Sequence, residues 1–299
     1  MQRSRGHSPH SVGLWPVLFV GPSVLGLIVL TLLTIVGALG GAFTQWNAVG
    51  GLGSIKFVGF RNFELLFTDP EFWTATGRTL IYTGFGVPIG VFGGMLVAIA
   101  LNGPVLGRTW LRAIFYIPAT VNVVAVGLVW LLALDPGSGP ISTLTSALGV
   151  GRFQWLASSS LALVALIAIH VWASVGFNTI VYLAALQDMP ADLYEAVMLD
   201  GAGPIRRFTT ITWPGLLPTT TMLLILSFIS SSQSFGLIAF LTRGGPGGST
   251  TTLAYYLYMN AFQYFDLGYA SAIGVIMFMI LIVLSLIIWR FQRGRALYS

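Results

Sequence analysis

The chain has 299 residues, of which 56% are hydrophobic and only 8% are charged, and its mean hydropathy is +0.86. Soluble domains carry about 25% charged residues, so this composition excludes a soluble enzyme, whose surface it could not cover with polar groups. The sequence contains no cysteine, which excludes disulfides and thiolate chemistry. The net charge of +5 comes from scattered basic residues, so no nucleic-acid partner is expected.

Six stretches are long and apolar enough to cross a membrane as helices. A hydrocarbon core about 30 Å thick needs about 20 apolar helical residues, and none of the six contains Asp, Glu, Lys or Arg. They cover residues 14–39, 79–101, 113–133, 161–186, 216–241 and 268–289. The sequence therefore predicts an all-α, polytopic membrane bundle with one domain over 14–289, flanked by tails at 1–13 and 290–299.

Basic residues predict the orientation of this bundle, because cytoplasmic loops carry an excess of Lys and Arg. With a cytoplasmic N-terminus, nine arginines lie inside and five basic residues lie outside. The nine are Arg3, Arg5, Arg108, Arg112, Arg206, Arg207, Arg290, Arg293 and Arg295, and the five are Lys56, Arg61, Arg78, Arg152 and Arg243. Both termini are therefore expected in the cytoplasm, and the connections 40–78, 134–160 and 242–267 outside.

Small residues in the second span predict a close helix contact. Gly86, Gly90 and Gly94 recur at every fourth position, and small side chains at this spacing let two helix backbones approach each other in lipid. Pro88 is expected to bend the same helix.

The most patterned segment is 188–218, DMPADLYEAVMLDGAGPIRRFTTITWPGLLP, called the coupling loop below. Asp188 is expected to cap a short helix over 191–199, with Pro190 near its first position. Gly201 is expected to end that helix, because glycine accepts a left-handed backbone. The apolar side of such a helix fits either a groove on a partner protein or the surface of its own domain.

The coupling loop resembles the EAA loop of binding-protein-dependent ABC permeases, within the sugar-permease branch of the maltose and glycerol-3-phosphate type. The resemblance is carried by Glu195-Ala196-Val197, Asp200-Gly201-Ala202, Phe208, Ile211, Pro214 and Pro218. A second segment, LTRGGPGGSTTTLAYYLYMNAFQYFDLGYASA over 241–272, resembles an outer loop of that branch and the entry to its last span. Val197 departs from the alanine of the motif, and Arg78 stands where the family often has asparagine.

Membership of this family would imply several partners. The chain lacks the G-x-x-x-x-G-K-[ST] pattern that cradles phosphates, so ATP and Mg²⁺ would bind two copies of a separate cytoplasmic ATPase, and this chain would bind no cofactor itself. The helix at 190–201 would dock in a cleft of one ATPase, with Glu195 as the charged anchor. The residues implied in this coupling are Glu195, Ala196, Asp200, Gly201 and Ala202. A second permease chain would complete the pathway, and an extracytoplasmic binding protein would deliver the solute to the outer loops.

Polar residues at helical spacing give candidates for the solute pathway, since a polar side chain in lipid is costly unless it faces a cavity or a partner. They are His170, Ser174 and Phe177 in the fourth span, Ser227, Ser231 and Ser234 in the fifth, and Asn122 in the third. In the maltose-type permease the corresponding stripes line the sugar site, which implies the same role here, with Phe177 covering the apolar face of a sugar. Serines in membrane helices also bond to their own backbone or to a neighbouring helix, which is the alternative.

Other functions fit the sequence less well. An ion-coupled secondary transporter usually carries an acidic residue within a span, and a membrane-embedded enzyme needs a catalytic cluster or a set of metal ligands, neither of which is visible. We therefore expect an ABC importer permease in the cell membrane that transports a carbohydrate. Glycerol-3-phosphate or a glycerophosphodiester is the alternative solute, and Arg78 and His170 are the features that hint at an anion.

Overall fold

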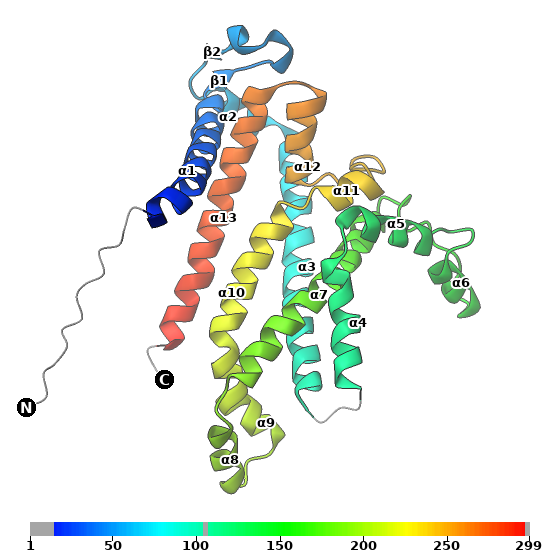
Figure 1. Ribbon diagram of the computed structural model, residues 1–299. Helices are drawn as coiled ribbons and strands as arrows, with labels where there is room; N and C mark the ends of the chain where they lie inside the picture. Colours follow the sequence, from blue (N-terminus) through cyan, green and yellow to red (C-terminus); the bar gives the residue numbers. More distant parts are fainter. Residues whose placement is uncertain (1–14, 104–106, 297–299) are drawn as a thin grey trace, which may run out of the picture.

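The computed structural model describes residues 15–103 and 107–296 and consists almost entirely of helices (Figure 1). The long helices are α1 (Trp15–Gly41), α3 (Pro70–Asn102), α7 (Ala162–Gln187), α10 (Trp213–Ser232) and α13 (Leu267–Ala296). The shorter helices are α2 (Arg61–Thr68), α4 (Arg108–Thr120), α5 (Val123–Ala133), α6 (Pro140–Ala147), α8 (Ala191–Leu199), α9 (Pro204–Arg207), α11 (Gly236–Leu241) and α12 (Leu253–Tyr258). The expected tail at 1–13 lies outside the described residues.

Short elements complete the described chain. Two π-helical turns, η3 (Phe208–Thr212) and η4 (Met259–Gln263), join neighbouring helices, and two 3-10 turns are η1 (Ala48–Gly50) and η2 (Leu52–Ser54). Strands β1 (Thr44–Gln45) and β2 (Lys56–Phe57) form one antiparallel pair, with Thr44 opposite Phe57.

Within the described residues, five helical runs are long and apolar enough to span a membrane, and a sixth span results if α4 and α5 are counted together. This confirms the expected class of polytopic α-helical membrane protein. The third expected span, 113–133, is wrong as one continuous helix, because α4 and α5 meet at an angle of 104°. Asn122 accounts for the restart, since its Oδ1 accepts a hydrogen bond from the Val124 amide at 2.9 Å and so caps α5.

The fifth expected span, 216–241, also contains a break. Helix α10 ends at Ser232, and α11 begins only at Gly236. The first break falls within apolar sequence, and the second falls in the polar run from Ser230 to Ser234. A hydropathy window of about 20 residues averages both with their apolar neighbours and reports a single span each time.

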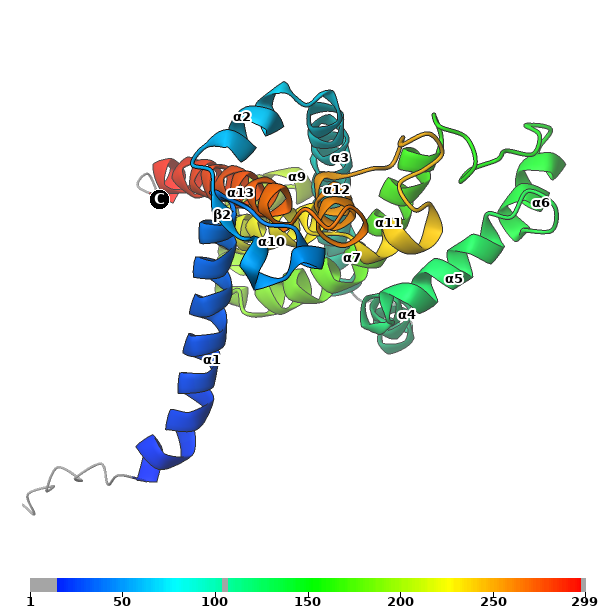
Figure 2. The ribbon, with the colours of Figure 1, turned by 90° about the horizontal axis from the view of Figure 1, so that it is seen from above.

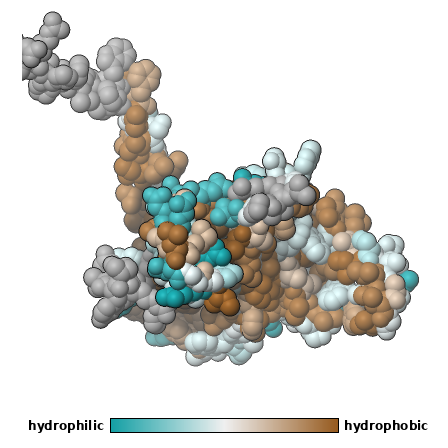
Figure 3. All heavy atoms as spheres, turned by 90° about the horizontal axis from the view of Figure 1, so that it is seen from below, coloured by the Kyte–Doolittle hydropathy of each residue, from teal (hydrophilic) through white to brown (hydrophobic). Residues whose placement is uncertain are grey.

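Helices α3, α7 and α10 form the centre of the bundle, and their contact holds a core cluster that includes Val91, Tyr182 and Leu223 (Figures 1 and 2). Helix α13 packs on one flank, and α4 to α6 extend on the other (Figure 2). Helix α1 touches α13 and then runs away from the bundle, with its apolar side chains exposed (Figures 2 and 3). Figure 1 places α8 and α9 at one end, called the loop end, and the β1–β2 pair with α2 and α12 at the other, called the hairpin end.

One carboxylate ties the hairpin end together. The Oδ1 atom of Asp69 caps α3 by accepting a hydrogen bond from the Glu71 amide at 2.8 Å. Its Oδ2 atom accepts hydrogen bonds from the hydroxyls of Tyr256 at 2.5 Å and Tyr269 at 2.6 Å, which belong to α12 and α13. Partial burial by itself would raise the pKa of the Asp69 carboxyl, but these hydrogen bonds outweigh it and lower that pKa below its usual value. Burial and the neighbouring carboxylate raise the pKa of the Tyr256 hydroxyl to about 12.

We expect Asp69→Asn to lower the free energy of unfolding by about 1 kcal/mol at neutral pH, a value reduced for partial exposure. Asparagine caps a helix as well as aspartate does, but when its oxygen caps α3 its amide nitrogen faces the two tyrosine hydroxyls, and that nitrogen can only donate. The folded-state pKa of Asp69 is depressed, so its stabilisation is complete above the usual Asp pKa and is lost as the pH falls through the folded value. Thermal unfolding of the wild type and the variant in nanodiscs from pH 7 to pH 3 should show their difference in melting temperature shrinking as the pH falls. The control Glu71→Gln changes an exposed carboxylate and should leave the melting temperature unchanged. A difference that stays constant with pH would contradict this role.

Candidate functional site

The α3–α7 contact is a seam of glycines against larger side chains. A Cβ atom added at Gly86 would lie 3.0 Å from His170 Cδ2, one at Gly90 would overlap Ser174 Oγ, and one at Gly94 would lie 2.5 Å from Asn178 Cβ. Both helices run in the same direction, from the hairpin end to the loop end (Figure 1). The seam confirms the close packing expected from the glycine spacing, and it fixes the direction in which His170 and Ser174 point.

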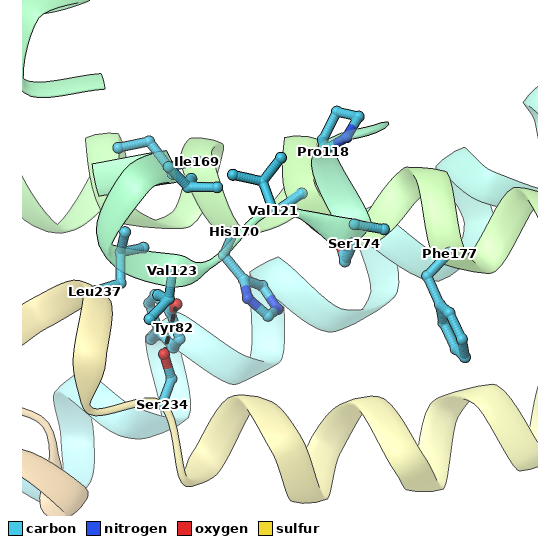
Figure 4. A pocket seen from close by; sticks show the side chains of 13 residues that line it. Tyr82, Pro118, Val121, Val123, Ile169, His170, Ser174, Phe177, Ser234 and Leu237 are labelled. Carbon is cyan, nitrogen blue, oxygen red and sulfur yellow. Dashed lines mark hydrogen bonds between the residues drawn. The ribbon is translucent and has the colours of Figure 1, made fainter. Parts of the chain in front are cut away.

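A cavity of about 290 Å³ opens beside this seam, where the α4–α5 and α10–α11 breaks face α7 (Figure 4). Its size is near the lower end of the range for ligand pockets, about 300–1,000 Å³. The lining residues are Tyr82, Pro118, Ala119, Val121, Val123, Val126, Ile169, His170, Ala173, Ser174, Phe177, Ser234 and Leu237. Most of these side chains are apolar, and the polar groups are confined to one tyrosine, one histidine and two serines, an arrangement typical of small-molecule sites.

The polar groups of the cavity lie close together. The Tyr82 ring centroid is 5.3 Å from that of His170, and the Tyr82 hydroxyl is 3.4 Å from Ser234 Oγ (Figure 4). His170 Nε2 is buried and has no hydrogen-bond partner among the described residues. The Ser174 hydroxyl donates to the Val171 carbonyl at 3.0 Å, so this serine partly fulfils the alternative of bonding to its own helix.

Four of the seven expected pathway residues line this cavity: His170, Ser174, Phe177 and Ser234. The α7 stripe stays together because α7 is continuous through all three of its members. Ser227 and Ser231 do not line the cavity, and Ser231 is buried within α10 without a partner among the described residues. The expectation that Ser234 shares a helical face with them is wrong, because α10 ends at Ser232.

Asn122 lies between two lining residues but does not line the cavity itself. Its side chain is instead used to cap α5. Sequence reasoning missed Tyr82 and the break at 121–122. An asparagine followed by an apolar run is a helix-start signal, so Asn122 could have revealed the break; Tyr82 gave only the weaker sign of a hydroxyl within an apolar span.

The coupling loop contains the expected helix, since α8 covers Ala191–Leu199. Its end is a Schellman motif, in which the Gly201 amide donates to the Met198 carbonyl at 3.0 Å and the Ala202 amide to the Val197 carbonyl at 3.2 Å. Gly201 has φ +73°, as the expected left-handed position requires. The expected cap is wrong: Asp188 ends α7, and Pro190 precedes α8 without a side-chain cap.

No residue of α8 is buried, although the helix carries apolar side chains. Leu199 is 89% exposed and Ile205, at the start of α9, is 81% exposed, while Glu195, Ala196 and Asp200 are also exposed. Seen from below, the loop end shows hydrophilic surface mixed with apolar patches (Figure 3). The domain therefore leaves this helix uncovered.

One side chain connects α8 to the rest of the bundle. The Tyr194 hydroxyl lies 3.0 Å from Thr212 Oγ1, at the end of η3 and directly before α10. Helix α8 is thus bonded to the turn that leads directly into α10, and α10 ends near the cavity.

A family model described as "Binding-protein-dependent transport system inner membrane component" matches residues 78–296. The chain belongs to this family. The match covers the cavity, the coupling loop and all elements between them. The permease is therefore a transporter subunit. It is a multi-pass inner-membrane component of a transport system that depends on a binding protein.

Three relatives of this permease illustrate the family. The chain is 33% identical over 282 residues to the sulfoquinovosyl glycerol transport system permease protein of Agrobacterium fabrum, covering 94% of this chain and 91% of the relative. It is 35% identical to the trehalose/maltose transport system permease protein of Thermococcus litoralis, covering 80% and 81%. It is 33% identical to the multiple sugar-binding transport system permease protein of Streptococcus mutans, covering 82% and 84%.

The permease fold also matches a solved structure. A chain from a bacterial ABC transporter involved in the import of the acidic polysaccharide alginate superposes with a TM-score of 0.82 at 25% identity, covering 94% of this chain and 96% of the other.

We expect Gly94→Ala to weaken the α3–α7 seam. Its Cβ would lie 2.5 Å from Asn178 Cβ and 3.0 Å from the Thr179 amide nitrogen, and a backbone atom cannot rotate away. Overpacking of this kind costs about 1–3 kcal/mol, which should appear as a lower melting temperature of the permease in nanodiscs. Gly84→Ala is the matched control. Gly84 lies on the same helix, and a Cβ atom there would meet nothing within 4 Å. Equal melting temperatures for the two variants would contradict the role of the seam.

Proposed function

We propose that this permease forms half of the translocation pathway of an ATP-driven importer for a carbohydrate. The observation that carries the proposal is the cavity beside the glycine seam, which groups His170, Ser174, Phe177 and Ser234 from segments far apart in the sequence. Its few polar atoms can bond sugar hydroxyls, and the half-exposed Phe177 ring offers a surface to the apolar face of a sugar. The names of the trehalose/maltose and multiple sugar-binding relatives support the same class of solute.

The other half of the pathway comes from a second permease chain in this proposal, and two copies of a cytoplasmic ATPase hold ATP and Mg²⁺. The exposed apolar surface of α8 and α9 supports docking at the loop end, because an uncovered apolar helix face gains free energy in a partner groove. Glu195 serves as the charged anchor of that contact. Both termini and the loop end then face the cytoplasm, and a binding protein delivers the solute to the hairpin end.

Motion reaches the cavity along a continuous structural path. The Tyr194–Thr212 bond joins α8 to the end of η3, and α10 runs from there to the break that contains Ser234. A rigid helix with one end at the docking surface and the other at the cavity transmits rigid-body movement between them.

A solute with an acidic group is the second candidate, which includes glycerol-3-phosphate. Arg78 is half-buried near the hairpin end, and its Nη1 lies 3.8 Å from where a Cβ of Gly248 would stand. A cation at the approach to the pathway favours an anion by electrostatic steering. The alginate importer whose structure resembles this fold is described as taking an acidic polysaccharide.

The first test is ATPase activity of the complete transporter in nanodiscs, assembled with the partner permease, ATPase and binding protein encoded beside it. Maltose, trehalose, sucrose, raffinose and glycerol-3-phosphate are added separately with the binding protein. We expect one sugar to stimulate ATP hydrolysis above the level without solute. Stimulation by glycerol-3-phosphate alone would retain the importer and replace the sugar, and failure to assemble with any ATPase would refute the proposal.

We expect Gly201→Asp and Glu195→Lys each to reduce uptake of the stimulating solute by at least about tenfold, because loss of a docking anchor costs about 2 kcal/mol or more. Gly201→Asp strains a left-handed backbone position, and Glu195→Lys reverses an exposed charge. Co-purification with the ATPase should fall in parallel. Gly203→Ala is the control, since Gly203 has φ −69° and open space around it. Normal uptake by both variants would remove the docking role.

A further inference from the structure

Tyr82 is fully buried yet places its hydroxyl at the cavity. Its ring packs against His170, and its hydroxyl faces Ser234 Oγ at 3.4 Å (Figure 4). Hydroxyl–hydroxyl hydrogen bonds are usually about 2.7–2.8 Å long, so this contact is a weak one. A better placed hydroxyl can therefore replace either partner at little cost.

Ser234 and Tyr82 differ in their local backbone. It lies in the break between α10 and α11, whereas Tyr82 lies within the continuous helix α3. Beyond the break, α11 packs on α5: a Cβ at Gly236 would lie 3.1 Å from Val123 Cγ1, and one at Gly127 would lie 2.6 Å from Phe240 Cδ1. The Tyr82–Ser234 bond therefore joins α3 to the short segment between α10 and α11, next to the cavity.

Behind the cavity wall, on the side of Gly86, His170 carries a nitrogen without a partner in the described part of the chain. His170 Nε2 is buried among the described residues without a hydrogen bond, beside the Tyr82 ring. If the His170 ring turns toward the cavity it lines, a solute hydroxyl that bonds this nitrogen lies next to the Tyr82 side chain. Since a sugar hydroxyl both donates and accepts, it can take the place of Ser234 as the partner of the phenol.

We propose that Tyr82 is a positioning residue that couples solute occupancy to α10. Without solute its hydroxyl holds Ser234 and keeps α10 attached to α3, and a bound solute hydroxyl takes over the phenol and releases Ser234. The release frees the cavity end of the helix whose other end carries the coupling loop. This inference rests on the proposed function and adds to it the contact by which solute controls ATP hydrolysis.

The test compares Tyr82→Phe with wild type in the complete transporter in nanodiscs, with the binding protein and the same five-solute panel. Phenylalanine keeps the ring against His170 and removes only the hydroxyl. We expect ATP hydrolysis without solute to rise by about 2-fold, the population shift that a weak neutral hydrogen bond supports. The maximal rate with the stimulating solute should stay unchanged, so the ratio of stimulated to unstimulated rate falls.

Tyr182→Phe is the matched control. Tyr182 is also fully buried and its hydroxyl donates to Thr220 Oγ1 of α10 at 3.0 Å, but neither residue lines the cavity. We expect its unstimulated rate to equal that of wild type. An equal rise in Tyr182→Phe would overturn the inference, because loss of any α10 attachment would then suffice.

Ser234→Ala removes the other partner of the bond and guards against an indirect effect at Tyr82. It should raise the unstimulated rate as Tyr82→Phe does, and the double variant should show no further rise if both act through one contact. Additive rises, or a Tyr82→Phe protein with the wild-type ratio, would overturn the inference while the importer function stands. A wild-type complex that no panel solute stimulates would overturn both.

Discussion

The parallel contact between α3 and α7 is the constraint on which the rest of the structure depends. Three glycines bring the two backbones so close that His170, Ser174 and Asn178 occupy the space a Cβ atom would need. In lipid, helices gain little from hiding apolar surface from each other, and close backbone packing supplies most of the attraction. The polar groups of α7 are therefore set in place by packing against α3, and the cavity opens at the edge of that contact.

Features with a local signal could be predicted from the sequence. The glycine spacing indicated the seam, apolar runs indicated the spans, and the order Asp200-Gly201 marked the end of α8, because periodicity and backbone freedom act over a few residues. The prediction that His170, Ser174 and Phe177 lie together was correct for the same reason, because α7 is unbroken.

The breaks could not be predicted by the same means. An average of hydropathy over a span cannot detect the change of direction at 121–122, and it merges the polar residues around 233–235 with their apolar neighbours. Counting i, i+4, i+7 across the second break placed Ser234 on the wrong face, although Ser234 reaches the cavity because the helix has ended. Tyr82 was missed because its role comes from residues about 90 and 150 positions further along the chain, and no local pattern records such contacts.

The two ends of the molecule differ in how firmly they are held. At the hairpin end, Asp69, Tyr256 and Tyr269 join three helices, and the Leu253 amide donates to Thr79 Oγ1 at 2.8 Å. At the loop end, α8 has no buried residue. A domain built in this way is held firmly at one end and leaves α8, the proposed docking helix, uncovered at the other.

Helix α10 gives this asymmetry a mechanical consequence. Together with α9 and η3 it forms an uninterrupted helical run over residues 204–232, which at about 1.5 Å per residue is a lever arm of about 40 Å. If its loop end is the pivot, a tilt of only about 5° carries the far end through about 3–4 Å. Hydrogen-bonded hydroxyl oxygens lie about 2.5–3.0 Å apart, so such a displacement is far larger than the width of that range and breaks the bond. In the proposed mechanism, this lever converts a small rotation at the loop end into a change of hydrogen-bond partner at the cavity.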